Sequence, residues 1–302
     1  MGYGSWKAED YVSYANSTGR NTISTSYTNA DGSTSTYTSL NSSYNAQDIF
    51  KSRQLDPKLD PYHVMRECND SDEHPNTIPV ILALDVTGSM GAAAAEVAKK
   101  LNVVMSKLYE TVTDVECMIM AIGDLAYDRA PIQISQFEAD IRVAEWLDKV
   151  YFERGGGGNQ YESYTAVWYM GLHHMMLDSW KRGKKGIIIT LGDEPLNPYL
   201  PEDALANATG DKLQGDVETA ELYRDASDKF DIYHIAVDDS ETCYNMYAPQ
   251  IDSTWGKYLD SEHLRISRVD EIVDYIIDIV SHAADTTEMA PEIFKPNMEI
   301  GW

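Results

Sequence analysis

Three oxygen-bearing residues, Asp85, Thr87 and Ser89, lie at intervals of two directly after an apolar run. Side chains alternate along an extended chain, so all three can face the same side. One carboxylate and two hydroxyls form a set of hard oxygen ligands that suits Mg²⁺ or Mn²⁺. This spacing predicts a metal site where a strand ends. The simpler alternative is that Thr87 and Ser89 only cap the helix that follows.

A second carboxylate, Asp193, follows another apolar run at 186–191. Between the two acidic positions lie four consecutive glycines, 155–158, and then Asn159 and Glu162 at the start of a helical stretch. A run of glycines lets the backbone come close to a bound ion or partner.

The apolar pattern predicts the elements that must position these side chains. From residue 78 onwards, apolar runs typical of buried strands alternate with stretches of helical periodicity. The predicted strands are 78–86, 115–123, 132–137, 186–191, 232–237 and 264–269, and the predicted helices are 91–112, 139–152, 162–180, 217–230, 246–259 and 270–284. This alternation predicts an α/β fold with a doubly wound, mostly parallel six-stranded sheet flanked by helices. Ligands of such folds bind outside the carboxyl ends of the strands, where Asp85 and Asp193 would lie.

The N-terminal part of the chain differs in composition from the rest. Of the 35 residues at 11–45, 26 are Ser, Thr, Tyr or Asn, so this segment is either a mobile tail or a polar β-hairpin. Thr- and Tyr-rich runs at 22–28 and 33–40 flank Asp31-Gly32, a hairpin-turn signal, and we predict the hairpin. We divide the chain into an N-terminal extension and linker (1–77), an α/β domain (78–285) and a C-terminal tail (286–302). The tail either packs back on the domain or docks into a partner.

Over about residues 78–285 the sequence resembles the von Willebrand factor A (vWA) family. The signature of that family is a metal-ion-dependent adhesion site: an Asp-x-Ser/Thr-x-Ser loop after the first strand, a Thr from a glycine-rich loop and an Asp after the fourth strand. Asp85, Thr87 and Ser89 match the first element, and Asp193 matches the last. Asn159 stands where the family usually has Thr, so the third ligand is open between Asn159 and Glu162. This departure suggests a divergent, intracellular branch of bacterial or phage type.

The resemblance implies a protein-binding domain without catalytic activity. Two neutral hydroxyls and one directly bound carboxylate leave a divalent cation, Mg²⁺ (or Mn²⁺ or Ca²⁺), under-neutralised. An acidic residue of a partner protein would then complete the coordination, with Asp193 acting through water. Intracellular vWA proteins often work beside AAA+ ATPases of the MoxR type, so such an ATPase is an expected partner on family grounds alone.

Two other functions are compatible with the same residues. The loop that begins at Asp85 also looks like the nucleophile loop of haloacid dehalogenase-type phosphatases, in which an Asp works with Mg²⁺. Lys184 or Lys185 could then steady a phosphoryl group, although Thr87 stands where that class has its general acid. The third hypothesis is a structural or assembly role, with the N-terminal hairpin as an attachment arm.

Charge and cysteine content narrow the function further. The chain has 49 acidic against 24 basic residues, a net charge of −25, which disfavours partnership with nucleic acid or an anionic membrane surface. Residues 1–78 hold ten acidic and six basic residues, so most of the acidity belongs to the α/β domain and would draw cations towards Asp85.

The apolar runs are too short to span a bilayer, and the N-terminus does not resemble a signal peptide. Cys68, Cys117 and Cys243 form neither a disulfide framework nor a CxxC motif, so we expect a reducing, cytoplasmic location.

One further pair has metal-ligand spacing. His174 and Asp178 lie at i, i+4 in the predicted helix 162–180 and would share a face of it. No third ligand accompanies them, so we expect them to have a packing role.

Overall fold

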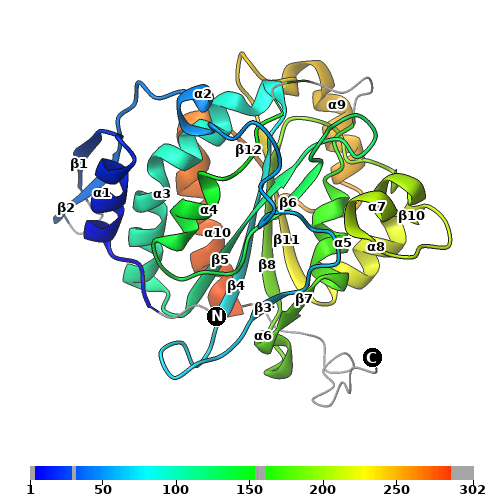
Figure 1. Ribbon diagram of the computed structural model, residues 1–302, viewed down its shortest axis with the longest axis horizontal. Helices are drawn as coiled ribbons and strands as arrows, with labels where there is room; N and C mark the ends of the chain where they lie inside the picture. The colour runs from blue at the N-terminus through cyan, green and yellow to red at the C-terminus, as the bar shows by residue number, and fades with distance from the viewer. Residues whose placement is uncertain (1–3, 29–31, 154, 156–160, 287–302) are drawn as a thin grey trace.

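A six-stranded sheet forms the centre of the molecule, with helices on both of its faces (Figure 1). The computed structural model describes residues 4–28, 32–153, 155 and 161–286. The strand order is β12-β11-β8-β4-β5-β6, and neighbouring strands are parallel except for β6, which is antiparallel to β5. The predicted fold class is therefore confirmed. The strands are β4 (Ile78–Asp85), β5 (Val115–Ile122), β6 (Ile132–Ile134), β8 (Gly186–Gly192), β11 (Phe230–Val237) and β12 (Leu264–Ser267).

The direction of winding reverses between β4 and β8. From β4 the chain moves outward through β5 to β6, whereas β8 lies on the other side of β4 and leads outward to β11 and β12. In doubly wound sheets the crevice at this reversal is where ligands bind. β4 and β8 pair in parallel up to Leu84 opposite Leu191, so Asp85 and Asp193 emerge at the same edge of the sheet.

Each face of the sheet is covered by helices whose apolar sides form a separate core cluster. The strands are buried on both faces, which explains their continuous apolar runs. One face carries α3 (Gly91–Thr111), α4 (Arg142–Leu147) and α10 (Ile272–Thr286), and the other carries α5 (Thr165–His173), α8 (Thr219–Ser227) and α9 (Tyr244–Trp255).

The N-terminal extension lies along α3, at the left of Figure 1. The predicted hairpin is confirmed, with Thr22 opposite Leu40, although its turn residues 29–31 lie outside the described residues. Its second strand is held to α3, because Asn102 Nδ2 donates to the Thr38 carbonyl at 2.7 Å and Tyr37 donates to Glu110 at 2.8 Å. The elements of this segment are α1 (Ala8–Ser17), β1 (Thr22–Thr28), β2 (Thr34–Leu40) and α2 (Ala46–Ile49).

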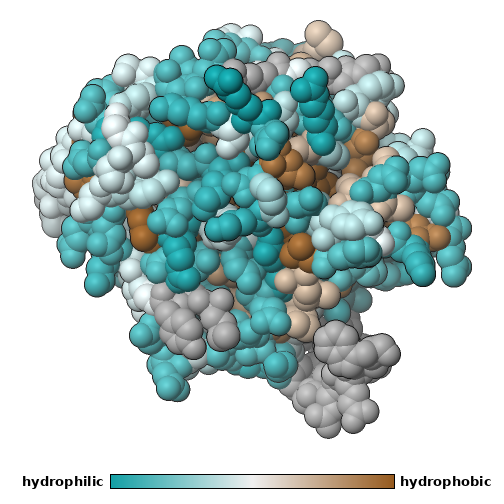
Figure 2. Space-filling model, viewed as in Figure 1, coloured by the Kyte–Doolittle hydropathy of each residue, from teal (hydrophilic) through white to brown (hydrophobic). Residues whose placement is uncertain are grey.

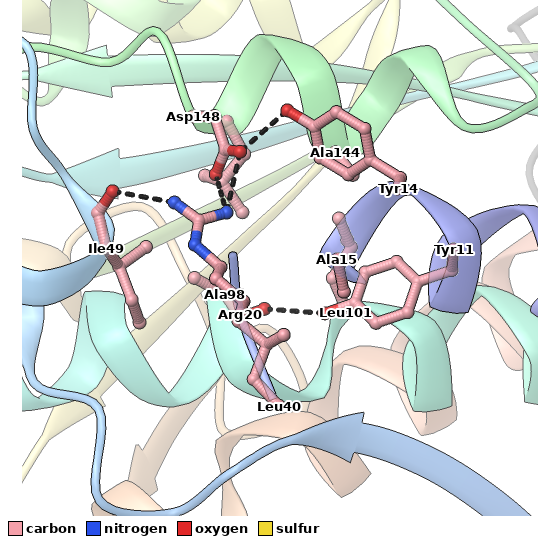
Figure 3. Close-up of a pocket in the computed structure, with 11 residues that line it drawn as sticks. Tyr11, Tyr14, Ala15, Arg20, Leu40, Ile49, Ala98, Leu101, Ala144 and Asp148 are labelled. Carbon is pink, nitrogen blue, oxygen red and sulfur yellow. Dashed lines mark hydrogen bonds and ion pairs between the residues drawn. The ribbon is translucent and has the colours of Figure 1, made fainter. Parts of the chain in front are cut away.

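A partly buried ion pair joins the extension to the end of α4. Arg20 donates to both carboxylate oxygens of Asp148, at 2.5 and 2.6 Å, and to the Ile49 carbonyl at 2.9 Å (Figure 3). Tyr14 donates to the same carboxylate at 2.6 Å. The remaining cavity of about 10 Å³ has room for no more than a water molecule, so we assign this pocket a structural role.

The predicted helix 162–180 is wrong in its second half. α5 ends at His173, and the chain then forms β7 (Met175–Leu177), which pairs in parallel with β3 (Arg66–Cys68), before α6 (Asp178–Lys181). β3, which is far away in the sequence, pairs with this backbone as a neighbouring strand. Helical periodicity is a local signal and cannot indicate that pairing. His174 and Asp178 therefore do not share a helix face. His174 instead contacts Asp211, 2.7 Å from its Nε2 to Oδ2.

Several short elements have no counterpart among the predictions. They are α1, α2, β3, β7, α7 (Glu202–Thr209), β9 (Tyr199–Leu200) and β10 (Val217–Glu218). The sheet strands and the long helices α3 and α10 begin and end within a few residues of their predicted limits. α4 is shorter than predicted.

Hydrophilic residues dominate the face shown in Figure 2, where apolar residues gather only in small separate patches. Exposed large apolar side chains come from distant parts of the sequence, for example Tyr62, Tyr127 and Met246. In the part of the chain that the structure describes, no helix combines the length and apolarity required to cross a membrane.

Candidate metal centre

The loop after β4 turns its oxygen atoms towards one another. Asp85 is 1% exposed, and its Oδ1 accepts hydrogen bonds from the backbone N–H of Thr87 at 2.9 Å and from the Thr87 hydroxyl at 2.6 Å. The hydroxyl of Thr87 makes no capping bond to the short 3₁₀ turn Gly88–Met90, and the N-cap of α3 is Met90. The helix-capping alternative for Thr87 and Ser89 therefore fails.

Asp193 lies opposite this loop, directly after β8. Its side chain is completely buried, and its Oδ2 accepts from the backbone N–H of Cys243 at 2.6 Å. The Ser89 hydroxyl lies near enough to this carboxylate to lower its pKa, against the larger effect of burial, which raises it. The other oxygen, Oδ1, has no hydrogen-bond partner among the described residues. A buried carboxylate oxygen without a partner is costly, and a cation would remove that cost.

Tyr164 joins the two acidic residues. Its hydroxyl donates to Asp85 Oδ2 at 2.8 Å and accepts from the backbone N–H of Asp193 at 3.2 Å. A Cβ atom at Gly192 would collide with the Tyr164 ring, so glycine is needed before Asp193 to admit this phenol. The bridge therefore holds both strand ends close together at the point where the winding reverses.

More carboxylates gather here than the sequence motifs indicate. Burial and the negative charge of Asp193 raise the pKa of Asp85, and burial followed by the charge of Asp85 raises the pKa of Glu162. Burial and the charges of Asp85 and Asp193 likewise raise the pKa of Glu194 to about 8. The cluster thus contains more negative charge than its described neighbours neutralise, and it favours either protons or a bound cation.

The donors present fit a hard divalent cation. No group of three or more His, Cys, Asp or Glu side chains within the described segments is arranged as a metal site. The structure instead brings together two carboxylates, Asp85 and Asp193, and two hydroxyls, Thr87 and Ser89. Such a mixed oxygen set suits Mg²⁺ or Mn²⁺ better than a softer metal.

The two candidates for a third ligand have different outcomes. Asn159 lies outside the described residues. Glu162 is 3% exposed, its Oε2 has no hydrogen-bond partner among the described residues, and its pKa responds to the charge of Asp85. The first glycine of the loop, Gly155, accepts through its carbonyl from Gly88 N–H at 3.0 Å, so this loop reaches the Asp85 turn.

The lysines proposed for a phosphatase lie at the wrong edge of the sheet. Lys184 and Lys185 precede β8, which runs parallel to β4, so a whole strand separates them from Asp85. Lys185 Nζ donates to the Ser227 carbonyl at 2.6 Å. Both oxygens of Asp85 accept hydrogen bonds, Oδ1 from Thr87 and Oδ2 from Tyr164.

Three contributors to the site have no motif in the sequence. They are the Tyr164 hydroxyl, the Glu194 carboxyl and the backbone N–H of Cys243. Glu194 could have been found as the neighbour of Asp193 at a strand end. Tyr164 and Cys243 reach the site only because the start of α5 and the loop after β11 pack over the edge of the sheet where β4 and β8 end. No local pattern in the sequence predicts that packing.

Comparison with known proteins gives similarity in structure only. No family model and no curated protein matches this chain. The pilus adhesin SpaC of Lactobacillus rhamnosus GG, in its open conformation, is similar with a TM-score of 0.47 and 11% identity over 74% of this chain. The vWF domain of the type V pili tip protein Mfa5 of Porphyromonas gingivalis is similar with a TM-score of 0.45 and 12% identity, over 71% of this chain and 97% of that domain. The chain spans 31% of the length of SpaC.

Proposed function

We propose that this chain is a vWA-type domain that binds a partner protein through a divalent cation, without catalysing a reaction. The observation that carries the proposal is the juxtaposition of the Asp85 loop and Asp193 at the winding reversal of the sheet. A buried carboxylate oxygen of Asp193 there has no partner in the described structure. The ordinary position for a ligand in this fold and an uncompensated negative site thus coincide.

Asp85, Thr87, Ser89 and Asp193 would hold the cation, with Glu162 as the additional carboxylate. The metal would supply positive charge that an acidic residue of the partner can bind. The residues of the chain itself have two tasks. Tyr164 keeps Asp85 and Asp193 together, and the surrounding acidic surface repels acidic partners wherever no cation is present. Binding then depends on the metal.

The identity of the partner belongs to the same proposal. The resemblance favours a protein that presents an acidic residue, such as a MoxR-type AAA+ ATPase, and Mg²⁺ as the cation, with Mn²⁺ or Ca²⁺ as substitutes. Cys68 and Cys117 are buried and free, and Cys243 is free and partly exposed. Free thiols support the expected reducing, cytoplasmic location.

Isothermal titration of the EDTA-treated protein with MgCl₂ tests the metal site. We expect saturable binding to the wild type and none to Asp193→Asn, which removes a charge at nearly constant shape. Asp203→Asn, an exposed acidic residue on α7, is the matched control and should bind like the wild type. Equal Mg²⁺ binding by Asp193→Asn and the wild type would contradict the proposed site.

Partner binding needs a separate experiment. Proteins captured from native lysate by the wild type in Mg²⁺ should be lost both in EDTA and with Asp85→Asn. If the same proteins were recovered in all these samples, the metal-dependent mechanism would be wrong. Turnover of a phosphate ester in Mg²⁺, abolished by Asp85→Asn, would establish the phosphatase alternative in its place.

A further inference from the structure

Two arginines that bond to none of the described residues line one groove of the molecule. The groove has a volume of about 510 Å³ and lies between the segment 53–60, the loop that precedes β6, and Tyr151. Arg53 and Arg129 are exposed in it, and neither guanidinium donates a hydrogen bond to any described residue. Every other arginine that the structure describes bonds to a carboxylate or a carbonyl: Arg20, Arg66, Arg142, Arg182, Arg224, Arg265 and Arg268.

The lack of partners is notable because the chain has about twice as many acidic as basic residues. Asp60 is the only acidic residue among the described residues that line the groove, and it already accepts a hydrogen bond from the backbone N–H of Tyr62 at 3.0 Å. Arg53 and Arg129 are therefore exposed in a groove whose described lining includes a single carboxylate. A guanidinium presents paired N–H donors that match the two oxygens of a carboxylate.

Two hydrogen bonds in series connect the lining of the groove to the candidate metal centre. Ala130, which lines it, donates through its backbone N–H to Glu153 at 2.7 Å. Glu153 in turn donates through its backbone N–H to the carbonyl of Val86 at 3.0 Å, next to Asp85. One short hydrogen-bonded stretch of chain thus links the arginine groove to the loop that would hold the cation.

We propose that the groove of Arg53 and Arg129 binds a second carboxylate of the partner protein whose first acidic residue completes the metal. This inference rests on the proposed function. The molecule has a net charge of −25 and repels an acidic segment over most of its surface. A bound cation and an adjacent pair of free guanidinium groups provide two attractive points for such a segment. The partner is therefore an acidic peptide segment with at least two carboxylates, rather than a single isolated acidic residue.

Fluorescence anisotropy with a labelled hexaglutamate peptide tests this inference at low ionic strength. The variants are Arg53→Gln/Arg129→Gln and, as a control of equal charge change, Lys212→Gln/Arg224→Gln, which alters exposed bases far from the groove in sequence. Each is titrated in MgCl₂ and in EDTA. We expect the groove variant to bind about tenfold more weakly in Mg²⁺ and the control variant less than twofold more weakly.

The outcomes separate the inference from the proposed function. Binding that needs Mg²⁺ but is equal in the groove and control variants overturns the inference and leaves the metal site standing. Binding that needs the arginines but is equal in Mg²⁺ and EDTA supports the groove and contradicts the metal-dependent function. Failure of the wild type to bind hexaglutamate in either buffer, or tighter binding of a labelled oligothymidylate through the same arginines, overturns the inference.

Discussion

The Arg20 pocket and the Asp85 site both hold charged groups with little exposure to solvent. Opposite charges pair in the first, whereas acidic groups gather in the second. Around Arg20, the two terminal guanidinium nitrogens bond to Asp148 and to the Ile49 carbonyl, which leaves only Nε without a partner among the described residues (Figure 3). The cavity between them, about 10 Å³, has room for no more than a water molecule. Around Asp85, acidic groups face one another, and a carboxylate oxygen of Asp193 has no partner in the described structure. The first arrangement pairs opposite charges within the fold, whereas the second gathers like charges and fits the cation that we propose. The difference is the one expected between a structural charge pair and a binding site.

We expect the largest change in the free energy of unfolding when the ion pair between Arg20 and Asp148 is broken. Arg20→Ala leaves the partly buried Asp148 without its cation. Because the Asp148 side chain is 19% exposed, the cost should lie at the lower end of the range for a buried pair, about 3 kcal/mol. Urea denaturation monitored by circular dichroism measures the free energy of unfolding. Arg224→Ala, which breaks the exposed pair with Asp225, is the control and should leave the midpoint unchanged. Equal losses in both variants would mean that the Arg20 pair has no special role.

Adding Mg²⁺ should stabilise the protein through the Asp85 site and leave the Arg20 pocket unaffected. With Mg²⁺ at about one hundred times its dissociation constant, the free energy of unfolding should rise by about 2.7 kcal/mol relative to EDTA. Asp193→Asn should lose this gain, and Arg20→Ala should retain it because its charge pair lies elsewhere. A gain that persisted in Asp193→Asn would place the metal at another site.

The pH dependence of stability in the metal-free protein tests whether the acidic groups at the Asp85 site are uncompensated. The pKa of Glu194 is raised to about 8, so its folded form binds a proton more tightly than the unfolded chain does. The contribution of Glu194 to the free energy of unfolding is therefore complete below about pH 4.5, and it is lost as the pH rises through 8. Partial exposure limits the loss to roughly 1 to 2 kcal/mol. Thermal melts in EDTA from pH 5 to 8 measure it, and Glu194→Gln should flatten the profile. An unchanged profile in that variant would contradict the assignment.

The smallest effect is expected at the bridge between the strand ends. Tyr164→Phe removes a hydrogen bond from Asp85 and another from the backbone of Asp193, at a cost of roughly 1 kcal/mol in EDTA. Tyr62→Phe, on an exposed ring, is the control. Chemical denaturation of both variants measures the difference. If Tyr164→Phe were as stable as the control, the phenol would not hold the site together.

The sheet and most residues of the candidate site could be proposed from the sequence because their signals are local. Doubly buried strands need continuous apolar runs, and the turn after β4 needs its oxygen-bearing residues at intervals of two. Asp85, Thr87, Ser89 and Asp193 could therefore be identified from the positions of these runs. The predicted helix over His174 and Asp178 failed because β3, far away in the sequence, pairs with the backbone at β7.

What the sequence by itself determined is the order of strands and helices and the acidic character of the domain, since periodicity and composition are properties of the chain alone. Only the tertiary structure decided which charges are satisfied. Arg20 meets Asp148 and Tyr164 meets Asp85 across long separations in sequence, while Arg53 and Arg129 share a groove without a carboxylate partner in the described structure. The physical reason is that electrostatic and hydrogen-bond energies depend on distance in space and on burial, and folding alone determines both.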